Sequence, residues 1–188
     1  MIIGIDEVGR GCWAGPLLAA AVGLEEGLQV PGLRDSKKLT AKKRLLLVGQ
    51  IQSATSSIGV GWVWPKEINK IGLTESVRLA MQRAVDQIDL ADSQVIIDGN
   101  YNYLPDVPNS SFLIQADDRV QAVAAASVIA KVLRDTYMKK LSETHPGYGF
   151  EKHVGYGTKL HQEALLKFGV LQSIHRLNYK PIKKLLQQ

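Results

Sequence analysis

The stretch MIIGIDEVGRG, residues 1–11, places two acidic residues directly after a short apolar run. Residues 2–5 are apolar and mostly β-branched, and Gly9 and Gly11 follow soon after, so the stretch predicts a buried strand over residues 2–6 that ends in a turn. Asp6 and Glu7 then lie at the end of that strand. Carboxylates at such a turn can lean toward one hard cation, which makes this pair a candidate metal site.

Apolar alternation and turn residues predict further strands at residues 17–23, 58–64, 95–97 and 111–114. Helices are expected at about 40–53 and 74–88, where Thr40 and Thr74 can act as N-caps. A long helix should run from Asp117 or Asp118 to about residue 142, and a last one from Thr158 to Phe168. This order predicts an α/β fold, with a mixed five-stranded sheet flanked by helices.

The domain organisation follows from what is missing between these elements, since no repeat or Pro-rich linker divides the sequence. We expect a catalytic domain over residues 1–145 and a small C-terminal helical extension over 146–188, packed together as one unit.

Composition narrows the class of protein. Of the 188 residues, 45% are hydrophobic and 22% charged, as in ordinary globular proteins. The apolar runs are too short to span a membrane, and Cys12, the single cysteine, is typical of a reducing compartment. A cytoplasmic monomer is therefore expected. The net charge of +5 favours a polyanionic partner.

A second acidic residue follows a predicted strand, because residues 95–97 run into the turn-forming triplet Asp98-Gly99-Asn100. If this strand lies beside the first one, the carboxylates of Asp6 and Asp98 can bind the same cation. Asp117 is a further candidate ligand. Each of these acids could instead cap a turn or a helix. Asp135 lies roughly 27 Å further along the long helix, so we expect it to pair with Arg134 or Lys139 at the surface.

Other motifs are less specific. Gly9-Arg10-Gly11 offers backbone amides without side-chain obstruction, although most such pairs of glycines are simply turns. Tyr156 could stack on a sugar or base, or be an ordinary exposed loop residue. The four histidines, at positions 145, 153, 161 and 175, show no zinc-site spacing. A serine-protease-like triad is also not expected, because no Gly-x-Ser-x-Gly motif occurs.

Several motifs in the same order resemble bacterial-type ribonuclease HII, the type 2 ribonuclease H family. They are IIGIDEVGRG (2–11) with AGP (14–16), RDSKKL (34–39), VIIDGN (95–100), ADDRVQAVAAASVIAKVLRD (116–135) and HVGYGTKLHQEAL (153–165). The resemblance implies a ribonuclease H-like fold and endonucleolytic cleavage of the RNA strand in RNA/DNA hybrids. It also implies incision at single ribonucleotides embedded in duplex DNA, as in ribonucleotide excision repair.

The resemblance also implies roles for individual residues. The family's metal-binding, catalytic carboxylates fall on Asp6, Glu7, Asp98 and Asp117, which implies two Mg²⁺ or Mn²⁺ ions with substrate and products with 3′-hydroxyl and 5′-phosphate ends. Substrate contacts fall on the backbone of Gly9, Arg10 and Gly11, on Tyr156, and on Lys37 and Lys38. The sequence departs from the family pattern at Gln115, where a lysine is usual, and at Cys12, where proline is common.

Two other classes of protein remain as alternatives. A sugar kinase or actin-like ATPase also carries Gly-Ile-Asp-x-Gly at a first strand, but such proteins use two domains of this kind, for which 188 residues leave little room. A non-catalytic nucleic-acid-binding module would explain the positive charge. It would not explain the candidate acids, because carboxylates repel phosphate unless a cation lies between them.

Overall fold

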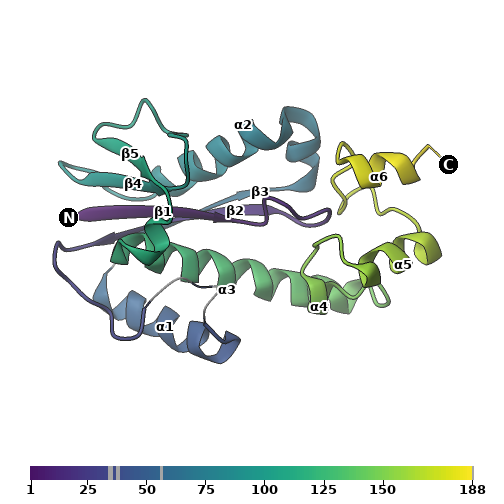
Figure 1. Ribbon diagram of the computed structural model, residues 1–188, viewed down its shortest axis with the longest axis horizontal. Coiled ribbons are helices and arrows are strands. Elements are labelled where there is room, and N and C mark those ends of the chain that lie inside the picture. Colours follow the sequence, from purple (N-terminus) through teal and green to yellow (C-terminus); the bar gives the residue numbers. More distant parts are fainter. Residues whose placement is uncertain (34–35, 37–38, 56, 188) are drawn as a thin grey trace.

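A single mixed sheet organises the fold. The computed structural model describes residues 1–33, 36, 39–55 and 57–187. The strands are β1 (Ile2–Val8), β2 (Leu17–Leu24), β3 (Ile58–Val63), β4 (Gln94–Asp98) and β5 (Ser110–Leu113), in the spatial order β3-β2-β1-β4-β5 (Figure 1). β1 pairs antiparallel with β2 and parallel with β4. The five-stranded mixed sheet expected from the sequence is therefore confirmed.

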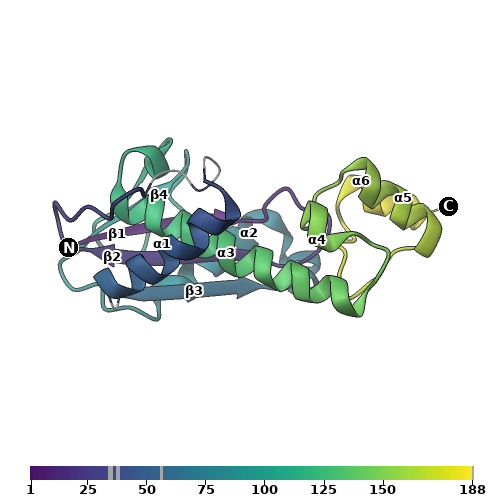
Figure 2. The ribbon, with the colours of Figure 1, turned by 90° about the horizontal axis from the view of Figure 1, so that it is seen from below.

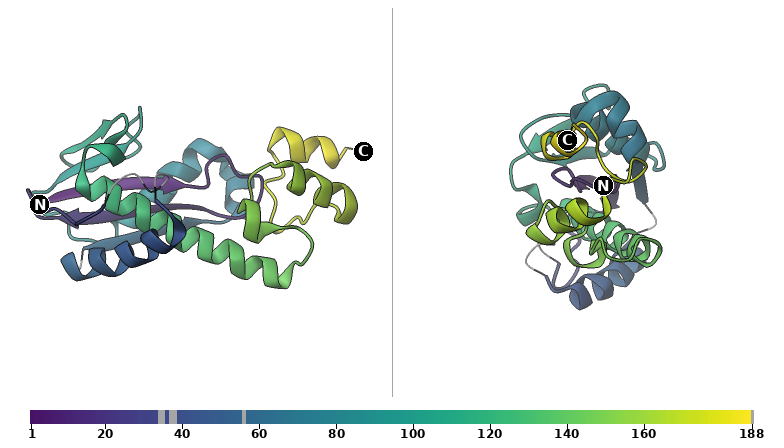
Figure 3. Two further views of the ribbon diagram at one scale, coloured as in Figure 1. Left: turned by 60° about the horizontal axis from the view of Figure 1, so that its bottom comes forward. Right: turned by 90° about the vertical axis from the view of Figure 1, so that its right-hand side faces the viewer.

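Helices lie on both faces of this sheet and beyond one of its ends. They are α1 (Ala41–Ala54), α2 (Pro65–Val85), α3 (Gln121–Thr144), α4 (Phe150–His153), α5 (Lys159–Phe168) and α6 (Lys180–Leu185). α2 lies on one face, whereas α3 and α1 lie side by side on the other (Figures 1 and 2). α4, α5 and α6 gather beyond one end of the sheet, next to the C-terminal half of α3 (Figure 3).

Glycines in the strands let the two long helices approach the sheet backbone. A Cβ atom built on Gly4 of β1 would lie 2.1 Å from the backbone nitrogen of Val123 in α3. On the other face, a Cβ on Gly61 of β3 would lie 1.9 Å from the carbonyl oxygen of Ala80 in α2. Only glycine fits at such distances, so these positions fix how closely α3 and α2 pack.

The hydrophobic core has one part on each face of the sheet and a third at the C-terminal end. Ile3 and Ile5 of β1 pack toward α2, whereas Leu18 and Ala20 of β2 pack toward α3 and α1. The third cluster joins Met138 of α3 to the C-terminal segment, through Ala14, Tyr148, Phe150, Ala164 and Ile174. None of the helices in the described ranges combines the length and apolar composition needed to cross a lipid bilayer.

The start of α2 differs from the sequence prediction. The helix begins at Pro65 rather than Thr74, because Pro65 occupies the first turn and the Glu67 carboxylate accepts a hydrogen bond from the Trp64 amide at 2.9 Å. Gly72 interrupts the helical dihedral angles with φ of 79°, which hides the first two turns from a search for helical spacing. The helix ends at Val85 rather than near residue 88.

Two other boundaries also differ from the predictions. β1 continues to Val8, so Asp6 and Glu7 lie within the strand and the turn begins at Gly9, with φ of 90°. Asp117 and Asp118 belong to a separate 3₁₀ helix, η2 (Ala116–Asp118), and α3 starts only at Gln121. Thr40 caps α1 as expected, and Thr158, the expected first residue of the last helix, is the N-cap of α5. The C-terminal segment after Gly169 contains a further short helix, α6.

Candidate functional site

Three aspartates from three different elements meet at one edge of the sheet. Asp6 lies on β1, Asp98 ends β4 and Asp117 lies in η2. One carboxylate oxygen from each lies within 4.8 Å of the others, a spacing that one divalent cation can bridge. Asp118 is exposed, whereas Asp117 and Asp6 are buried.

Strand pairing brings Asp6 and Asp98 together. β1 and β4 are parallel neighbours with Ile5 opposite Ile97, so the next residues, Asp6 and Asp98, lie side by side. The adjacency that the sequence could only assume is therefore present. Asp98 Oδ1 accepts a hydrogen bond from the Ala116 amide at 2.8 Å, which fixes the first residue of η2. The carboxylate of Asp98 thus helps to place Asp117.

Burial and mutual repulsion make this cluster unfavourable when it is fully ionised. Burial raises the pKa of the Asp6 carboxyl well above its ordinary value of 3.8, and the negative charges of Glu7 and Asp98 raise it further. Burial also raises the pKa of Glu7, although the Arg10 guanidinium partly opposes this effect. A bound divalent cation would offset both effects, so the carboxylates fit such an ion.

Glu7 lies next to this cluster and is paired with a cation. Strand alternation turns Glu7 away from the face that carries Asp6. Its Oε1 lies 3.7 Å from Arg10 Nη1, and Arg10 in turn lies over the ring of Tyr103 with its guanidinium carbon 5.8 Å from the ring centroid. The Arg10 side chain is thus held at the edge of the acidic cluster.

A small pocket opens beside Asp6. Its lining combines β1, the segment before α1, the middle of α3 and the loop after α4, with the residues Asp6, Glu7, Val8, Ser36, Ser127, Lys131 and Tyr156. Ser36 Oγ and Ser127 Oγ lie 2.8 Å apart. Lys37 and Lys38, which the resemblance assigns to phosphate contacts, fall outside the described residues. The pocket therefore joins acids, a lysine and an aromatic ring.

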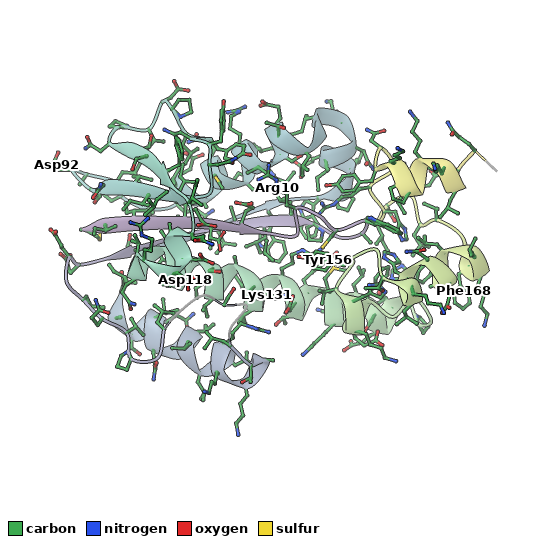
Figure 4. The ribbon with its side chains drawn as sticks, in the orientation of Figure 1. Arg10, Asp92, Asp118, Lys131, Tyr156 and Phe168 are labelled. Carbon is green, nitrogen blue, oxygen red and sulfur yellow. The ribbon has the colours of Figure 1, made fainter. Side chains whose placement is uncertain are left out.

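Tyr156 reaches this pocket because its loop pairs with the residues after the first turn. The Trp13 amide donates to the Gly155 carbonyl at 2.8 Å, and a Cβ on Gly157 would lie 2.1 Å from the ring of Trp13. In the view of Figure 4, Tyr156 lies between Arg10 and Lys131, and Tyr156 and Lys131 line the same pocket. The loop thus carries an exposed aromatic ring to the acidic edge.

Two fully buried arginines hold the Gly9-Arg10-Gly11 turn from beneath. Arg134 donates to the carbonyls of Pro16 at 2.8 Å and Val154 at 2.9 Å, and its Nε would lie 2.2 Å from a Cβ on Gly9. Arg176 Nη1 donates to the Arg10 carbonyl at 3.0 Å. Because all these acceptors are backbone carbonyls, the arginines fix the turn and the Tyr156 loop relative to each other.

These supporting residues were not identified from the sequence. Ser127, Lys131 and Arg134 recur at helical spacing on one face of α3, and polar residues on a face otherwise lined by alanine and valine are the signal that could have revealed them. Asp135 pairs with Lys131 at 2.9 Å and lies 3.9 Å from Arg44, so its expected pairing with Arg134 or Lys139 is wrong. The physical reason is that Arg134 turns into the core.

The two departures from the family pattern lie in different surroundings. Gln115 is exposed and adopts left-handed dihedral angles, with φ of 55°, immediately before η2. Cys12 is fully buried, and its Sγ lies 3.6 Å from the Val154 carbonyl oxygen. Burial raises the pKa of the Cys12 thiol. The thiol therefore fills space beneath the Tyr156 loop.

Comparison with known proteins places this geometry in a family. The sequence model described as "Ribonuclease HII" matches residues 3–182. A "Ribonuclease HII" from Shewanella piezotolerans is 44% identical over 182 residues, covering 96% of this chain and 89% of that protein.

Two solved structures share the fold. The ribonuclease H2 from Pyrococcus horikoshii OT3 superposes with a TM-score of 0.84 at 23% identity, covering 99% of this chain and 97% of that one. Bst-RNase HIII in complex with Mn²⁺ superposes with a TM-score of 0.76 at 23% identity, covering 99% of this chain and 69% of that one. The match over residues 3–182 and the 44% identity to the Shewanella protein show that the chain belongs to the ribonuclease HII family.

Proposed function

We propose that the protein is an endoribonuclease of the ribonuclease H class, which hydrolyses the RNA strand of RNA/DNA hybrids and incises at single ribonucleotides embedded in duplex DNA. The observation that carries this proposal is the meeting of Asp6, Asp98 and Asp117 within 4.8 Å, beside a pocket that also contains Tyr156. Membership of the ribonuclease HII family supports the reaction class.

The carboxylates of Asp6, Glu7, Asp98 and Asp117 are the proposed ligands of Mg²⁺ or Mn²⁺. Their oxygens suit hard cations, and a cation would offset both the burial and the neighbouring negative charges that raise the pKa of Asp6. The complex of Bst-RNase HIII with Mn²⁺ is consistent with this assignment. Two such ions would activate the attacking water and stabilise the departing 3′-oxygen, leaving 3′-hydroxyl and 5′-phosphate ends.

Recognition of the ribonucleotide is assigned to the turn and the loop next to the acids. Arg176 donates to the Arg10 carbonyl and Arg134 packs against Gly9, so the turn of Gly9, Arg10 and Gly11 is held in place before substrate arrives. We propose that Tyr156 stacks on the sugar there, where the 2′-hydroxyl is the group that distinguishes RNA from DNA.

Both parts of the chain contribute to the proposed substrate-binding surface. Tyr156 lies in the segment 146–188 and the acids lie in 1–145, so we propose that both parts form one substrate-binding unit. Lys131 borders the pocket, and we propose that Lys37 and Lys38 also contact phosphate of the substrate. A monomeric state and a cytoplasmic location stay predictions.

A cleavage assay with matched duplexes tests this function. The purified protein is given a DNA duplex with one ribonucleotide, an RNA/DNA hybrid and plain DNA, each with Mg²⁺ or Mn²⁺ and then with chelator. We expect cutting only of the first two, dependent on metal and lost in Asp98→Asn, whereas the remote control Asp92→Asn cuts normally. Equal cleavage of plain DNA, or a fully active Asp98→Asn variant, would contradict the proposal.

A further inference from the structure

Three buried histidines lie directly behind the Tyr156 loop. His153 ends α4, His161 lies in α5 and His175 precedes α6. The rings of His153 and His161 stack with centroids 4.4 Å apart, and those of His161 and His175 are 5.3 Å apart. His161 and His175 are fully buried. Buried polar rings need hydrogen-bond partners, and these partners define what the cluster does.

The backbone of Tyr156 is held by two of these histidines. Its amide donates to the carbonyl of His153 at 2.9 Å, and its carbonyl oxygen lies 3.0 Å from His161 Nδ1. The Gly155 amide donates to His153 Nδ1 at 3.1 Å. Both polar groups of the Tyr156 backbone are therefore fixed from behind, while its ring faces the pocket.

The hydrogen-bond partners determine where each proton lies. A carbonyl oxygen can only accept, so His161 must carry its proton on Nδ1, and its Nε2 is then an acceptor. His161 Nε2 lies 3.1 Å from His175 Nε2, so His175 must donate from Nε2. His175 Nδ1 is left to accept from the Leu171 amide at 3.0 Å. One chain of donors thus runs from Leu171 through His175 and His161 to Tyr156.

An alternative proton arrangement is less favourable. The Leu171 carbonyl lies 3.1 Å from His175 Nδ1 and could accept a hydrogen bond from it if that nitrogen carried the proton. That choice would leave two lone pairs facing each other between the imidazoles. The same carbonyl already accepts from the amides of Ile174 at 3.0 Å and His175 at 2.8 Å. The donor chain that ends on Tyr156 satisfies every ring nitrogen without a charge.

We propose that His161 and His175 act together as positioning residues, holding the Tyr156 loop so that its ring meets the ribose of the substrate. This inference rests on the proposed role of Tyr156 in substrate recognition. Because the two rings are hydrogen-bonded nitrogen to nitrogen, donation from His175 Nε2 favours the His161 tautomer that presents its Nδ1 proton to the Tyr156 carbonyl. The pair thus forms a hydrogen-bond relay that orients the Tyr156 loop and does not touch the reacting atoms.

The relay requires both rings to be neutral. Burial lowers the pKa of His161 and of His175 to about 4 each. The ionisable groups facing the pair are His153 from α4, Tyr148 before it and His145 at the end of α3. In this set a positive charge has only neutral or cationic neighbours. A second proton would also set two N–H groups against each other across 3.1 Å.

The wild-type protein offers a direct spectroscopic test. Long-range ¹H–¹⁵N correlation spectra of labelled full-length protein at pH 6–8 distinguish Nδ1–H from Nε2–H tautomers. We expect the Nδ1–H form for His161, the Nε2–H form for His175, and no titration of either ring in this range. The opposite tautomer of His161, or a ring that titrates near pH 6.5, would overturn the relay.

Two variants of similar polarity separate positioning from packing. In His161→Asn the side-chain amide replaces Nδ1–H and can still donate to the Tyr156 carbonyl. In His161→Gln it replaces Nε2 and loses that bond while filling more of the cavity. If the proposal holds, cleavage at a single ribonucleotide falls about 10- to 100-fold in kcat/KM for the Gln variant and far less for the Asn variant. Equal losses, or a greater loss for Asn, would contradict it.

A double-mutant cycle distinguishes failure of the relay from failure of the proposed function. If His161 acts through Tyr156, His161→Gln has no further effect on kcat/KM in a Tyr156→Ala background. An undiminished effect there overturns the positioning role. Tyr156→Ala with unchanged selectivity for the ribonucleotide also overturns it, while metal-dependent cleavage by the wild type would still uphold the proposed function. A wild type that cuts no ribonucleotide-containing substrate overturns the proposed function itself.

Discussion

Replacing Asp6 with asparagine should abolish cleavage and at the same time stabilise the metal-free protein. Asparagine keeps the shape of the side chain and an oxygen that can accept from the Glu7 amide, which donates to Asp6 Oδ1 at 2.7 Å. The substitution removes one negative charge from a buried cluster. Its effect on stability therefore reports the electrostatic cost of the site.

The geometry sets the size of this effect. Two unit charges 4.8 Å apart, the largest separation of the ligand oxygens, repel by about 3.5 kcal/mol at an effective dielectric constant of about 20. The wild type escapes part of this repulsion by keeping protons on the cluster. We therefore expect Asp6→Asn to raise the free energy of unfolding by about 1–3 kcal/mol, with roughly 2–4 °C in Tm for each kcal/mol.

The pH dependence has a defined sign. Because the pKa of Asp6 is raised in the folded protein above its ordinary value of 3.8, the folded chain keeps a proton that the unfolded chain releases. Wild-type stability in chelator should then be lost as the pH rises from about 4 through the folded-state pKa. The difference between variant and wild type should grow over the same range.

Thermal and urea unfolding in chelator, at several pH values, measure this effect. The control is Asp92→Asn, because Asp92 is an exposed acid at the far end of the sheet (Figure 4). This variant should unfold with the same free energy as the wild type. Adding Mn²⁺ should stabilise the wild type by about 2.7 kcal/mol at a hundredfold excess over Kd, and Asp6→Asn by much less. An Asp6→Asn variant less stable than the wild type in chelator would refute the electrostatic reasoning.

Three further predictions concern packing, bracing and pH. Gly4→Ala should lower the free energy of unfolding, measured in urea, by about 1–3 kcal/mol or more, because its Cβ would collide with the α3 backbone. Gly49→Ala, where the Cβ meets open space, should cause no such loss, and equal stabilities of the two variants would contradict the close approach. Arg134→Met should lower the free energy of unfolding by about 3–5 kcal/mol and lower kcat/KM, because the buried carbonyls of Pro16 and Val154 lose their donor. A loss of unfolding free energy below about 1 kcal/mol would mean that Arg134 does not brace the turn. At limiting Mn²⁺, the cleavage rate should rise with pH as the carboxyl groups with raised pKa lose their protons, and then level off. A pH-rate profile in which the rate falls over that range would contradict this expected pH dependence.

Local patterns were sufficient to predict the sheet and most helices. Alternating apolar residues marked the strands and Thr40 marked the start of α1, because these signals depend only on residues close in sequence. The start of α2 was missed for a reason that is also local. Gly72 breaks the helical spacing, and the bond from the Trp64 amide to Glu67 that begins the helix leaves no apolar pattern.

The site was only partly predictable because it depends on tertiary contacts. Asp6 and Asp98 could be proposed from turns after strands, but only the parallel pairing of β1 with β4 brings them together. The roles of Arg134 and Arg176 depend on carbonyls more than a hundred residues away. Likewise, the spacing of His153, His161 and His175 argues against a zinc site, yet it does not show that their rings meet.

The central claim is that the three aspartates hold the divalent cation of a ribonuclease. Anomalous diffraction from crystals of the full chain grown with Mn²⁺ tests it most directly. We expect an anomalous peak coordinated by carboxylate oxygens of Asp6, Asp98 and Asp117, whose separations of at most 4.8 Å leave room for one ion between them. Crystals of Mn²⁺-active protein with no peak there, or with a peak bound only by other residues, would contradict the claim.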